Sequence, residues 1–357
     1  DIDPDVNIMV TTTDLGHPSC TAFQPDGYEP AKGAPITEAC VNRPDDFTGL
    51  GNNPPVFLAA ACTDHCPVAV DDFIHFEGAD AGFTNVPGND LEGAMSCIGP
   101  QGINGCGYEA PLEAMMQAIN PTAEWNQGDT PFLRNGAILA IAIVTDEADC
   151  SVRSPEGYSY FTDDDTFWEV NPDTGTKTQA TSAVCWNAGV DCGAANPDGT
   201  YDNCNSADFG VLHPLTRYLD YLQTELIGND DKRVIMLGVV GIPEVTAHNE
   251  EPPFEPTAGG VDDLVYRQWD GETWANGGDI LPDDEADGAT ADSKEWEFGI
   301  GPGCTGEDGN GGFTGQAIPP VRVKEVCQAL NGEDAIRCCM ESICDDDFSP
   351  AINCLAG

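Results

Sequence analysis

Two segments of the chain are uninterrupted apolar runs with the length of a β-strand, residues 138–145 (ILAIAIVT) and residues 234–240 (VIMLGVV). A strand that is apolar on both of its sides is typical of a sheet covered by helices on both faces. Residues 6–12 (VNIMVTT) and 56–61 (VFLAAA) are predicted as two further strands. These runs predict a buried sheet at the centre of the fold.

Three amphipathic segments, each beginning at a proline, are predicted as helices: residues 111–119, 214–226 and 320–330. In the first of them, apolar residues recur at positions 112, 115, 116 and 119, which places them on one helix face. A proline suits the first turn of a helix. The order of strands and helices along the chain predicts an α/β fold with a doubly wound, mostly parallel sheet.

Two long stretches interrupt this order within what we expect to be a single domain over residues 1–357. Residues 151–210 form a cysteine-rich insertion, and residues 243–318 form an acidic insertion rich in glycine and proline. The second insertion contains three tryptophans, which disordered segments lack. We therefore expect an ordered excursion packed on the domain, with mobility confined to residues 282–293.

The chain has sixteen cysteines, an even number, and no Cys-x-x-Cys pair. Without metal-binding or redox spacing, this content indicates up to eight disulfides and an oxidising compartment, so we expect a secreted, extracellular or cell-surface protein. Cys97 and Cys106 are close enough in sequence to pair, and the adjacent Cys338 and Cys339 are expected to take different partners. A third group is expected to pair within itself or with Cys150: Cys185, Cys192 and Cys204.

Charge and hydropathy exclude two classes of partner. The chain has 13 Lys and Arg residues and 62 Asp and Glu residues, which gives a net charge of −49. Such a surface repels nucleic acids and anionic membrane surfaces, and it attracts divalent cations. No segment approaches the roughly 20 apolar residues of a membrane span.

The run at residues 132–152 (FLRNGAILAIAIVTDEADCSV) resembles the fourth-strand region of the cysteine-rich von Willebrand factor A-like proteins found in myxobacteria. Residues 7–16 (NIMVTTTDLG) resemble the second strand of that family and the turn after it. Residues 97–115 (CIGPQGINGCGYEAPLEAM) resemble its helix entry, and residues 342–351 (SICDDDFSPA) resemble its C-terminal segment. The resemblance implies a Rossmann-like sheet with a metal-ion-dependent adhesion site at the carboxyl ends of its strands.

In the wider family, the metal is held by an Asp-x-Ser-x-Ser motif after the first strand, a threonine from a second loop and an aspartate after the fourth strand. Asp146 stands at the last of these positions, with Glu147 beside it, and Asn104 is the oxygen donor in the loop that would supply the threonine. An oxygen ligand set suits Mg²⁺ or Ca²⁺. The chain contains no Asp-x-Ser-x-Ser motif. The alternative for Asp146 is that it caps the turn after the strand.

The resemblance assigns residues 6–12 to the second strand, so the first strand and its metal loop are expected upstream of Asp1. That strand lies between the second and the fourth, in the order 3-2-1-4-5-6. Its absence would leave unpaired backbone groups in the core, each of which costs about 1–3 kcal/mol. We therefore expect a separate strand to fill the place, supplied by the protein's own cleaved N-terminal segment or by a neighbouring copy.

No motif of a known enzyme class occurs: the chain has no Gly-x-Ser-x-Gly, no His-Glu-x-x-His and no phosphate loop, and its five histidines are scattered. Residues 283–288 (DDEADG) begin like a calcium loop, but Lys294 stands where that loop needs a glutamate, which favours a solvated acidic loop. We do not expect an enzyme. The sequence favours an extracellular binding or adhesion module with a divalent-metal site completed by a segment outside this chain. The alternative is a structural or assembly protein of an extracellular complex or filament, without a working metal site.

Overall fold

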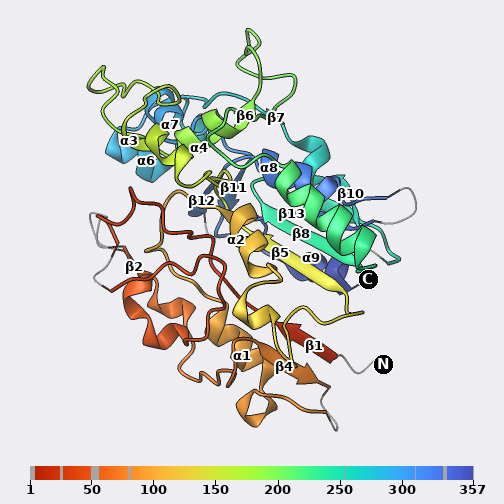
Figure 1. Ribbon diagram of the computed structural model, residues 1–357. Coiled ribbons are helices and arrows are strands. Elements are labelled where there is room, and N and C mark those ends of the chain that lie inside the picture. The colour runs from red at the N-terminus through yellow and green to blue at the C-terminus, as the bar shows by residue number, and fades with distance from the viewer. Residues whose placement is uncertain are drawn as a thin grey trace. The chain divides into compact units, whose positions relative to one another are not determined.

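The computed structural model describes residues 5–24, 27–49, 56–78, 82–252, 254–309, 311–332 and 336–356. The chain divides into two compact units, Asp1–Asn135 and Gly136–Gly357. Figure 1 shows the helices and strands of both. The expectation of one domain over residues 1–357 stays a prediction.

The C-terminal unit is built on a parallel sheet of three strands in the order β13-β8-β5. The strands are β5 (Leu139–Val144), β8 (Val234–Val240) and β13 (Cys338–Ser342). The first two lie within the apolar runs at residues 138–145 and 234–240, so both strands were predicted correctly. An α/β fold with a parallel sheet is thereby confirmed, and the larger doubly wound arrangement stays a prediction.

Helices cover the two faces of this sheet. Cys338 and Cys339 point to opposite faces because side chains alternate along a strand. Cys338 is bridged to Cys327 in α8 (Val321–Gln328), and Cys339 is bridged to Cys354 in α9 (Ser349–Ala356). The α8 face is also covered by α5 (Thr216–Leu219), which continues as a π-helix over Asp220–Asn229 and buries Leu222 and Leu226. Helices were thus predicted correctly near residues 214–226 and 320–330.

The excursions at residues 151–210 and 243–318 share one hydrophobic core, in which Trp186 and Trp269 are buried together. Where residues 282–293 were expected to be mobile, the structure has two helices. The second of them begins with a capping box between Thr290 and Ser293, which satisfies backbone N–H groups at its first turn. The elements of these excursions are α3 (Ser159–Thr162), α4 (Ala183–Gly189), β6 (Val190–Asp191), β7 (Asn205–Ser206), β9 (Val245–His248), β10 (Pro256–Gly259), α6 (Pro282–Asp287), α7 (Ala291–Phe298), β11 (Cys304–Glu307) and β12 (Phe313–Ala317).

The N-terminal unit has two antiparallel ribbons, β1 (Asp5–Ile8) with β4 (Ile74–Glu77), and β2 (Thr48–Gly49) with β3 (Val56–Phe57). It also contains α1 (Leu91–Ile98) and α2 (Pro111–Ala118), the second of which was predicted. Short 3-10 helices of this unit lie at Cys40–Asn42, Pro44–Phe47, Ala59–Ala61, Pro87–Asn89 and Glu124–Asn126. Those of the C-terminal unit lie at Glu156–Tyr158, Gly260–Asp263 and Trp274–Asn276.

Two strand predictions in this unit are wrong in extent and in pairing. Residues 6–12 were expected to form a strand of the buried parallel sheet, but the strand ends at Ile8 and pairs antiparallel with β4. The alternation of Asp5, Val6, Asn7 and Ile8 gives it one apolar side, which suits a two-stranded ribbon with a single covered face. Residues 56–61 form only the two-residue strand β3, followed by a 3-10 turn.

All sixteen cysteines are paired, in eight disulfides. The expected Cys97–Cys106 bridge is wrong, because Cys97 pairs with Cys66 and Cys106 pairs with Cys20. The other expectations are confirmed, with bridges Cys150–Cys185 and Cys192–Cys204 and separate partners for Cys338 and Cys339. Each bridge joins two cysteines of the same unit. Among the residues described, no helix is long and apolar enough to cross a membrane.

Candidate functional site at the carboxyl end of the parallel sheet

The segment that follows β5 is anchored by a buried ion pair. Arg322 Nε donates to Asp149 Oδ2 over 2.9 Å, and the two side chains are 3% and 0% exposed. Asp149 Oδ1 accepts from the Ser151 hydroxyl, and Arg322 Nη2 donates to the backbone carbonyl of His213. The disulfide from Cys150 to Cys185 adds a covalent anchor. These contacts fix the backbone at the point where β5 ends.

Asp146 lies in this anchored segment with its side chain exposed. Its backbone carbonyl accepts a hydrogen bond of 2.7 Å from the N–H of Ile318. The next residue, Glu147, is half-buried, and its N–H donates to the hydroxyl of Thr145. A rigid backbone therefore presents the Asp146 carboxylate at the carboxyl end of the sheet, where ligand sites of open α/β sheets lie.

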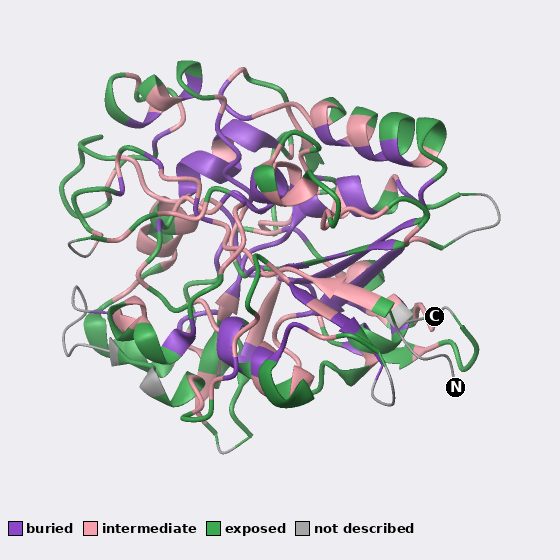
Figure 2. Ribbon diagram, turned by 60° about the horizontal axis from the view of Figure 1, so that its bottom comes forward, coloured by how far each residue is buried: buried purple, intermediate pink, exposed green. Residues whose placement is uncertain are grey.

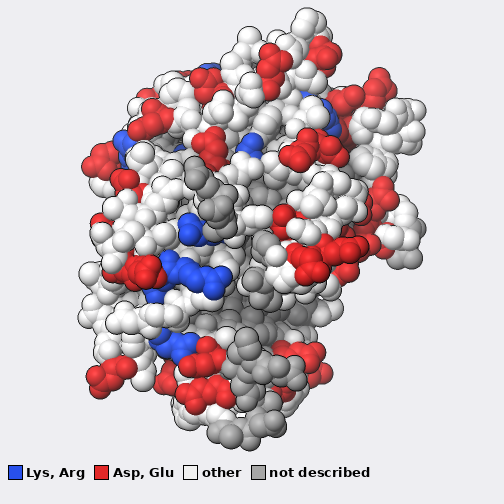
Figure 3. Space-filling view, turned by 90° about the vertical axis from the view of Figure 1, so that its right-hand side faces the viewer, with Lys and Arg blue, Asp and Glu red and all other residues white. Residues whose placement is uncertain are grey.

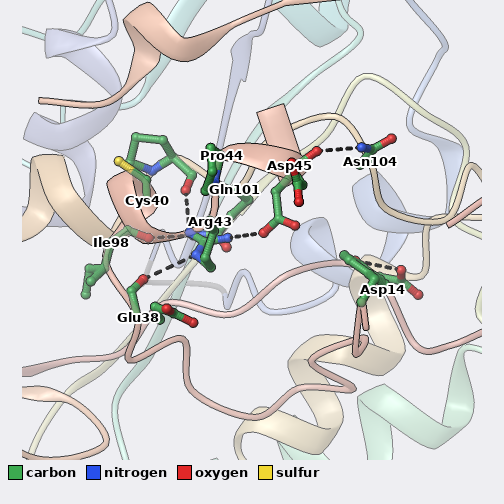
Figure 4. A network of polar contacts seen from close by, with 12 residues as sticks. Asp14, Glu38, Cys40, Arg43, Pro44, Asp45, Ile98, Gln101 and Asn104 are labelled. Atoms are coloured by element: carbon green, nitrogen blue, oxygen red, sulfur yellow. Dashed lines mark hydrogen bonds and ion pairs between the residues drawn. The ribbon is translucent and has the colours of Figure 1, made fainter. Parts of the chain in front are cut away.

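Asn104, the third expected ligand, belongs to the N-terminal unit and has a structural role there (Figure 4). Its amide nitrogen donates to the backbone carbonyls of Asp45 and Thr48. Close by, Arg43 donates to Asp46 at 2.8 Å and to the carbonyl of Pro100 at 3.0 Å. These bonds tie the loop of residues 99–106 to the turn before β2. A metal site shared by Asn104, Asp146 and Glu147 stays a prediction.

Two further acidic groups have structural roles: the Asp14 side chain and the segment at residues 283–288. Asp14 is buried, and its carboxylate accepts from the N–H of Gly16, the N–H of Cys106 and the hydroxyl of Tyr28. Burial and the Asp14 carboxylate raise the pKa of the Tyr28 phenol above its usual range. The segment that begins like a calcium loop is instead helix α6, in which Asp284 forms an ion pair of 2.7 Å with Lys294.

The outer edge of β5 pairs with no other strand that the structure describes. Its inner edge pairs with β8. On that side, the N–H groups of Leu139 and Thr145 donate to the backbone carbonyls of Arg233 and Val239. Hydrogen-bonding direction alternates along a strand, so Ala140, Ala142 and Val144 direct their N–H and C=O groups to the other side. Within the described part of the chain, no strand pairs with that edge.

One face of β5 is open as well. Leu139, Ile141 and Ile143 are buried, whereas the alternate residues 140, 142 and 144 are exposed, with Val144 at 59%. Every residue of the neighbouring strand β8 is buried. Figure 2 colours the ribbon by burial in this way. On the same face, α9 packs on Leu237 and Val239 of β8. Exposed apolar side chains therefore occur on the same strand as backbone groups that have no partner strand among the described residues.

A group of ligand-type side chains that the sequence reading missed lies on the ribbon of β1 and β4. One ligand atom from each of Asp5, His75 and Glu77 lies within 4.8 Å of the others. His75 Nε2 is 3.2 Å from Glu77 Oε1, and Glu77 Oε2 accepts from the N–H of Phe83. The Phe83 N–H and His75 hold the pKa of the Glu77 carboxyl below its usual range. The sequence carries only a weak signal of this group: polar and apolar residues alternate in Asp5-Val6-Asn7 and in His75-Phe76-Glu77, over strands of four residues.

The acidic composition is visible on the molecular surface. Asp and Glu side chains are spread over the face shown in Figure 3, with fewer Lys and Arg side chains among them. Comparisons with known proteins give no match to a family model, to a curated protein or to a solved structure. The likeness to von Willebrand factor A-like proteins therefore rests on the sequence motifs alone.

Proposed function

We propose that the chain is an extracellular binding module whose parallel sheet accepts an added strand along β5. The observation that carries the proposal is the open edge of β5, where exposed apolar side chains and unpaired backbone groups occur together. An exposed apolar edge strand is a template for pairing with another polypeptide. Strand addition to a sheet edge is a common mode of peptide recognition, in which main-chain hydrogen bonds supply affinity and side-chain contacts supply specificity.

The donor is a short extended segment rather than a second whole copy of the chain. At a net charge of −49, two copies repel each other at low ionic strength, and a short segment brings much less charge to the edge. The sequence resemblance points to the first strand of the von Willebrand factor A-like fold as this segment. A strand from a neighbouring copy is the alternative donor, and it would make the protein an assembly component.

The added strand would also complete a divalent-cation site. The carboxyl ends of parallel strands meet at one edge of a sheet, so a strand parallel to β5 would end beside Asp146. An Asp-x-Ser-x-Ser motif at that point would supply oxygen ligands for Mg²⁺ or Ca²⁺ in addition to the Asp146 carboxylate. This site would give the module metal-dependent adhesion.

Hydrogen exchange tests strand addition residue by residue. In the protein purified from its source, the amides of Ala140, Ala142 and Val144 should exchange slowly, because the added strand accepts their hydrogen bonds. The amides of Ile141 and Ile143 are internal controls, since β8 protects them with or without a donor. Slow exchange at the two control amides together with fast exchange at Ala140, Ala142 and Val144 would contradict the proposal.

A variant pair tests the same edge by assembly. Ala142→Pro removes an N–H that points away from β8, so the existing ladder stays intact while strand addition is blocked. We expect the co-purifying segment, detected by intact mass and N-terminal sequencing, to be lost. Val170→Lys changes an exposed valine of the C-terminal unit outside the strand and should retain the segment.

The metal-dependent part has its own test. Calorimetric titration with Ca²⁺ and Mg²⁺ of the complete assembly should show saturable binding that Asp146→Ala abolishes. The matched control is Asp173→Ala, another exposed aspartate of the same unit, which should leave binding unchanged. Binding that survives in Asp146→Ala would favour the assembly protein without a working metal site.

A further inference from the structure

The face of the β1–β4 ribbon opposite its core carries only polar side chains. Directly opposed residues of an antiparallel pair share a face, and here Asp5 faces Glu77 and Asn7 faces His75. The alternate residues of both strands pack against α1 in a buried apolar cluster. The four polar side chains are therefore held on one side of a ribbon whose other side is fixed in a core.

The opposition of Asp5 and Glu77 is unfavourable by itself, because like charges directly opposite each other destabilise a strand pair. Arg134 relieves the charge of Asp5, with its guanidinium bound to the Asp5 carboxylate and to the Asp5 carbonyl. A carboxylate has two oxygens, so Asp5 can keep Arg134 on one of them and offer the other. A cation between Asp5 and Glu77 would remove the remaining repulsion.

The tautomer of His75 is set by Asn7. The Asn7 amide nitrogen donates to the backbone carbonyls of Pro131 and Phe132, at 3.3 and 3.2 Å, which fixes the orientation of the amide. Its oxygen therefore faces His75 Nδ1, at 2.6 Å, and accepts a hydrogen bond from the Nδ1–H group. In the neutral ring the lone pair is then on Nε2, which faces Glu77. Metal-binding histidines are oriented in this way, with the second ring nitrogen donating to an oxygen behind it.

The distance between the His75 and Glu77 ligand atoms fits a small divalent ion, and one atom of Asp5 lies within 4.8 Å of both. Two ligands that are about 2.0–2.1 Å from a tetrahedral ion lie roughly 3.3 Å apart, and His75 Nε2 and Glu77 Oε1 are 3.2 Å apart. One imidazole and two carboxylates form a mixed nitrogen and oxygen set, which suits Zn²⁺ and related transition ions better than Mg²⁺ or Ca²⁺. We propose that Asp5, His75 and Glu77 bind a divalent transition-metal ion, with Asn7 as the residue that positions the imidazole. With three protein ligands, the ion would keep a coordination position for water or for a group from a partner.

Zinc binding to the full chain tests this site independently of the strand proposed at β5. Calorimetry at about pH 8, where an ordinary imidazole is neutral, is run in excess Mg²⁺ to occupy the many non-specific acidic groups. We expect one Zn²⁺ ion per chain to bind without being displaced by the excess Mg²⁺. This binding should be lost in His75→Ala. His65→Ala is the matched control, since His65 is exposed and also lies beside a carboxylate, Asp90, and this variant should bind as the unchanged protein does.

Asn7→Ala separates positioning from ligation. Loss of a hydrogen-bond partner behind a metal ligand weakens metal binding by about 10–100-fold, so Asn7→Ala should bind Zn²⁺ more weakly and His75→Ala should not bind it at all. Co²⁺ used in place of Zn²⁺ should show a visible absorption band that shifts in Asn7→Ala, which a change in stability alone would not produce. Far-UV circular dichroism checks that both variants are folded. Equal Zn²⁺ affinity in His75→Ala and in the unchanged protein, or no Mg²⁺-resistant Zn²⁺ at all, would overturn the proposal.

Discussion

Replacing Arg322 by methionine should destabilise the C-terminal unit strongly. The change keeps much of the side-chain length, but it leaves the Asp149 carboxylate, which is 0% exposed, without its guanidinium partner. Breaking a buried ion pair by removing one partner costs about 3–5 kcal/mol, because an uncompensated charge stays in the interior. A unit of this size loses roughly 2–4 °C in unfolding temperature per kcal/mol, so the midpoint should fall by about 6–20 °C.

Tryptophan fluorescence is a suitable probe, because five of the six tryptophans lie in the C-terminal unit. The matched control is Arg153→Met, which breaks the partly exposed pair between Arg153 and Asp208, with side chains 31% and 51% exposed. Exposed pairs contribute about 1 kcal/mol or less, so this variant should unfold within a few degrees of the unchanged protein.

A double variant separates charge from packing. Adding Asp149→Asn to Arg322→Met removes both charges and keeps an acceptor for the Ser151 hydroxyl. The double variant should therefore be more stable than Arg322→Met alone, since no unpaired charge stays buried. If Arg322→Met and Arg153→Met unfold at the same temperature, the assignment of a structural role to the buried pair is wrong.

Three further expectations concern redox state and pH. Iodoacetamide without reductant should modify none of the sixteen cysteines in the folded protein, and each bridge lost on reduction should lower the unfolding free energy by about 2–4 kcal/mol. Burial raises the pKa of Glu295, so its contribution to stability is present below about pH 4 and is lost as the pH rises through the raised pKa. Glu295→Gln should therefore raise the unfolding midpoint at neutral pH more than at acidic pH, and an equal effect at both would contradict this. Burial also lowers the pKa of His17 to about 4, so denaturant titrations should show the N-terminal unit losing on the order of 3 kcal/mol between about pH 6.5 and pH 4, a loss that His17→Phe should remove.

The sequence predicted β5 and β8 correctly because an apolar run of strand length leaves few alternatives. It did not predict β13, whose residues Cys-Cys-Met-Glu-Ser show neither an apolar run nor a regular alternation. The polar members of this strand are tolerated in the interior because distant residues satisfy them. Glu341 is paired with His248 at 2.9 Å, and the Ser342 hydroxyl donates to the carbonyl of Ile242. Such partners are set by the fold and cannot be read from the local sequence.

Of the two candidate sites, one was predicted from the local sequence and the other depends on contacts that only the fold creates. Asp146 follows a predictable strand, so its place at the carboxyl end of the sheet was predicted from the sequence alone. The group around His75 was not predicted, because its ligands meet only when β1 pairs with β4, almost 70 residues away. Each of these strands has four residues, which is too short for a two-residue period to stand out.

The two disulfides at the start of β13 have a consequence for growth of the sheet. Through Cys338 and Cys339, this strand is fastened to a helix on each face, and the segment of β10 and the 3-10 helix at Gly260–Asp263 contacts it. All five of its residues are buried, unlike those of β5. The sheet is therefore covered at β13, whereas β5, at its other edge, is paired only with β8 among the described residues. If β5 takes up a strand as we propose, β13 offers no second free edge, so addition would stop after one strand instead of continuing into a fibril.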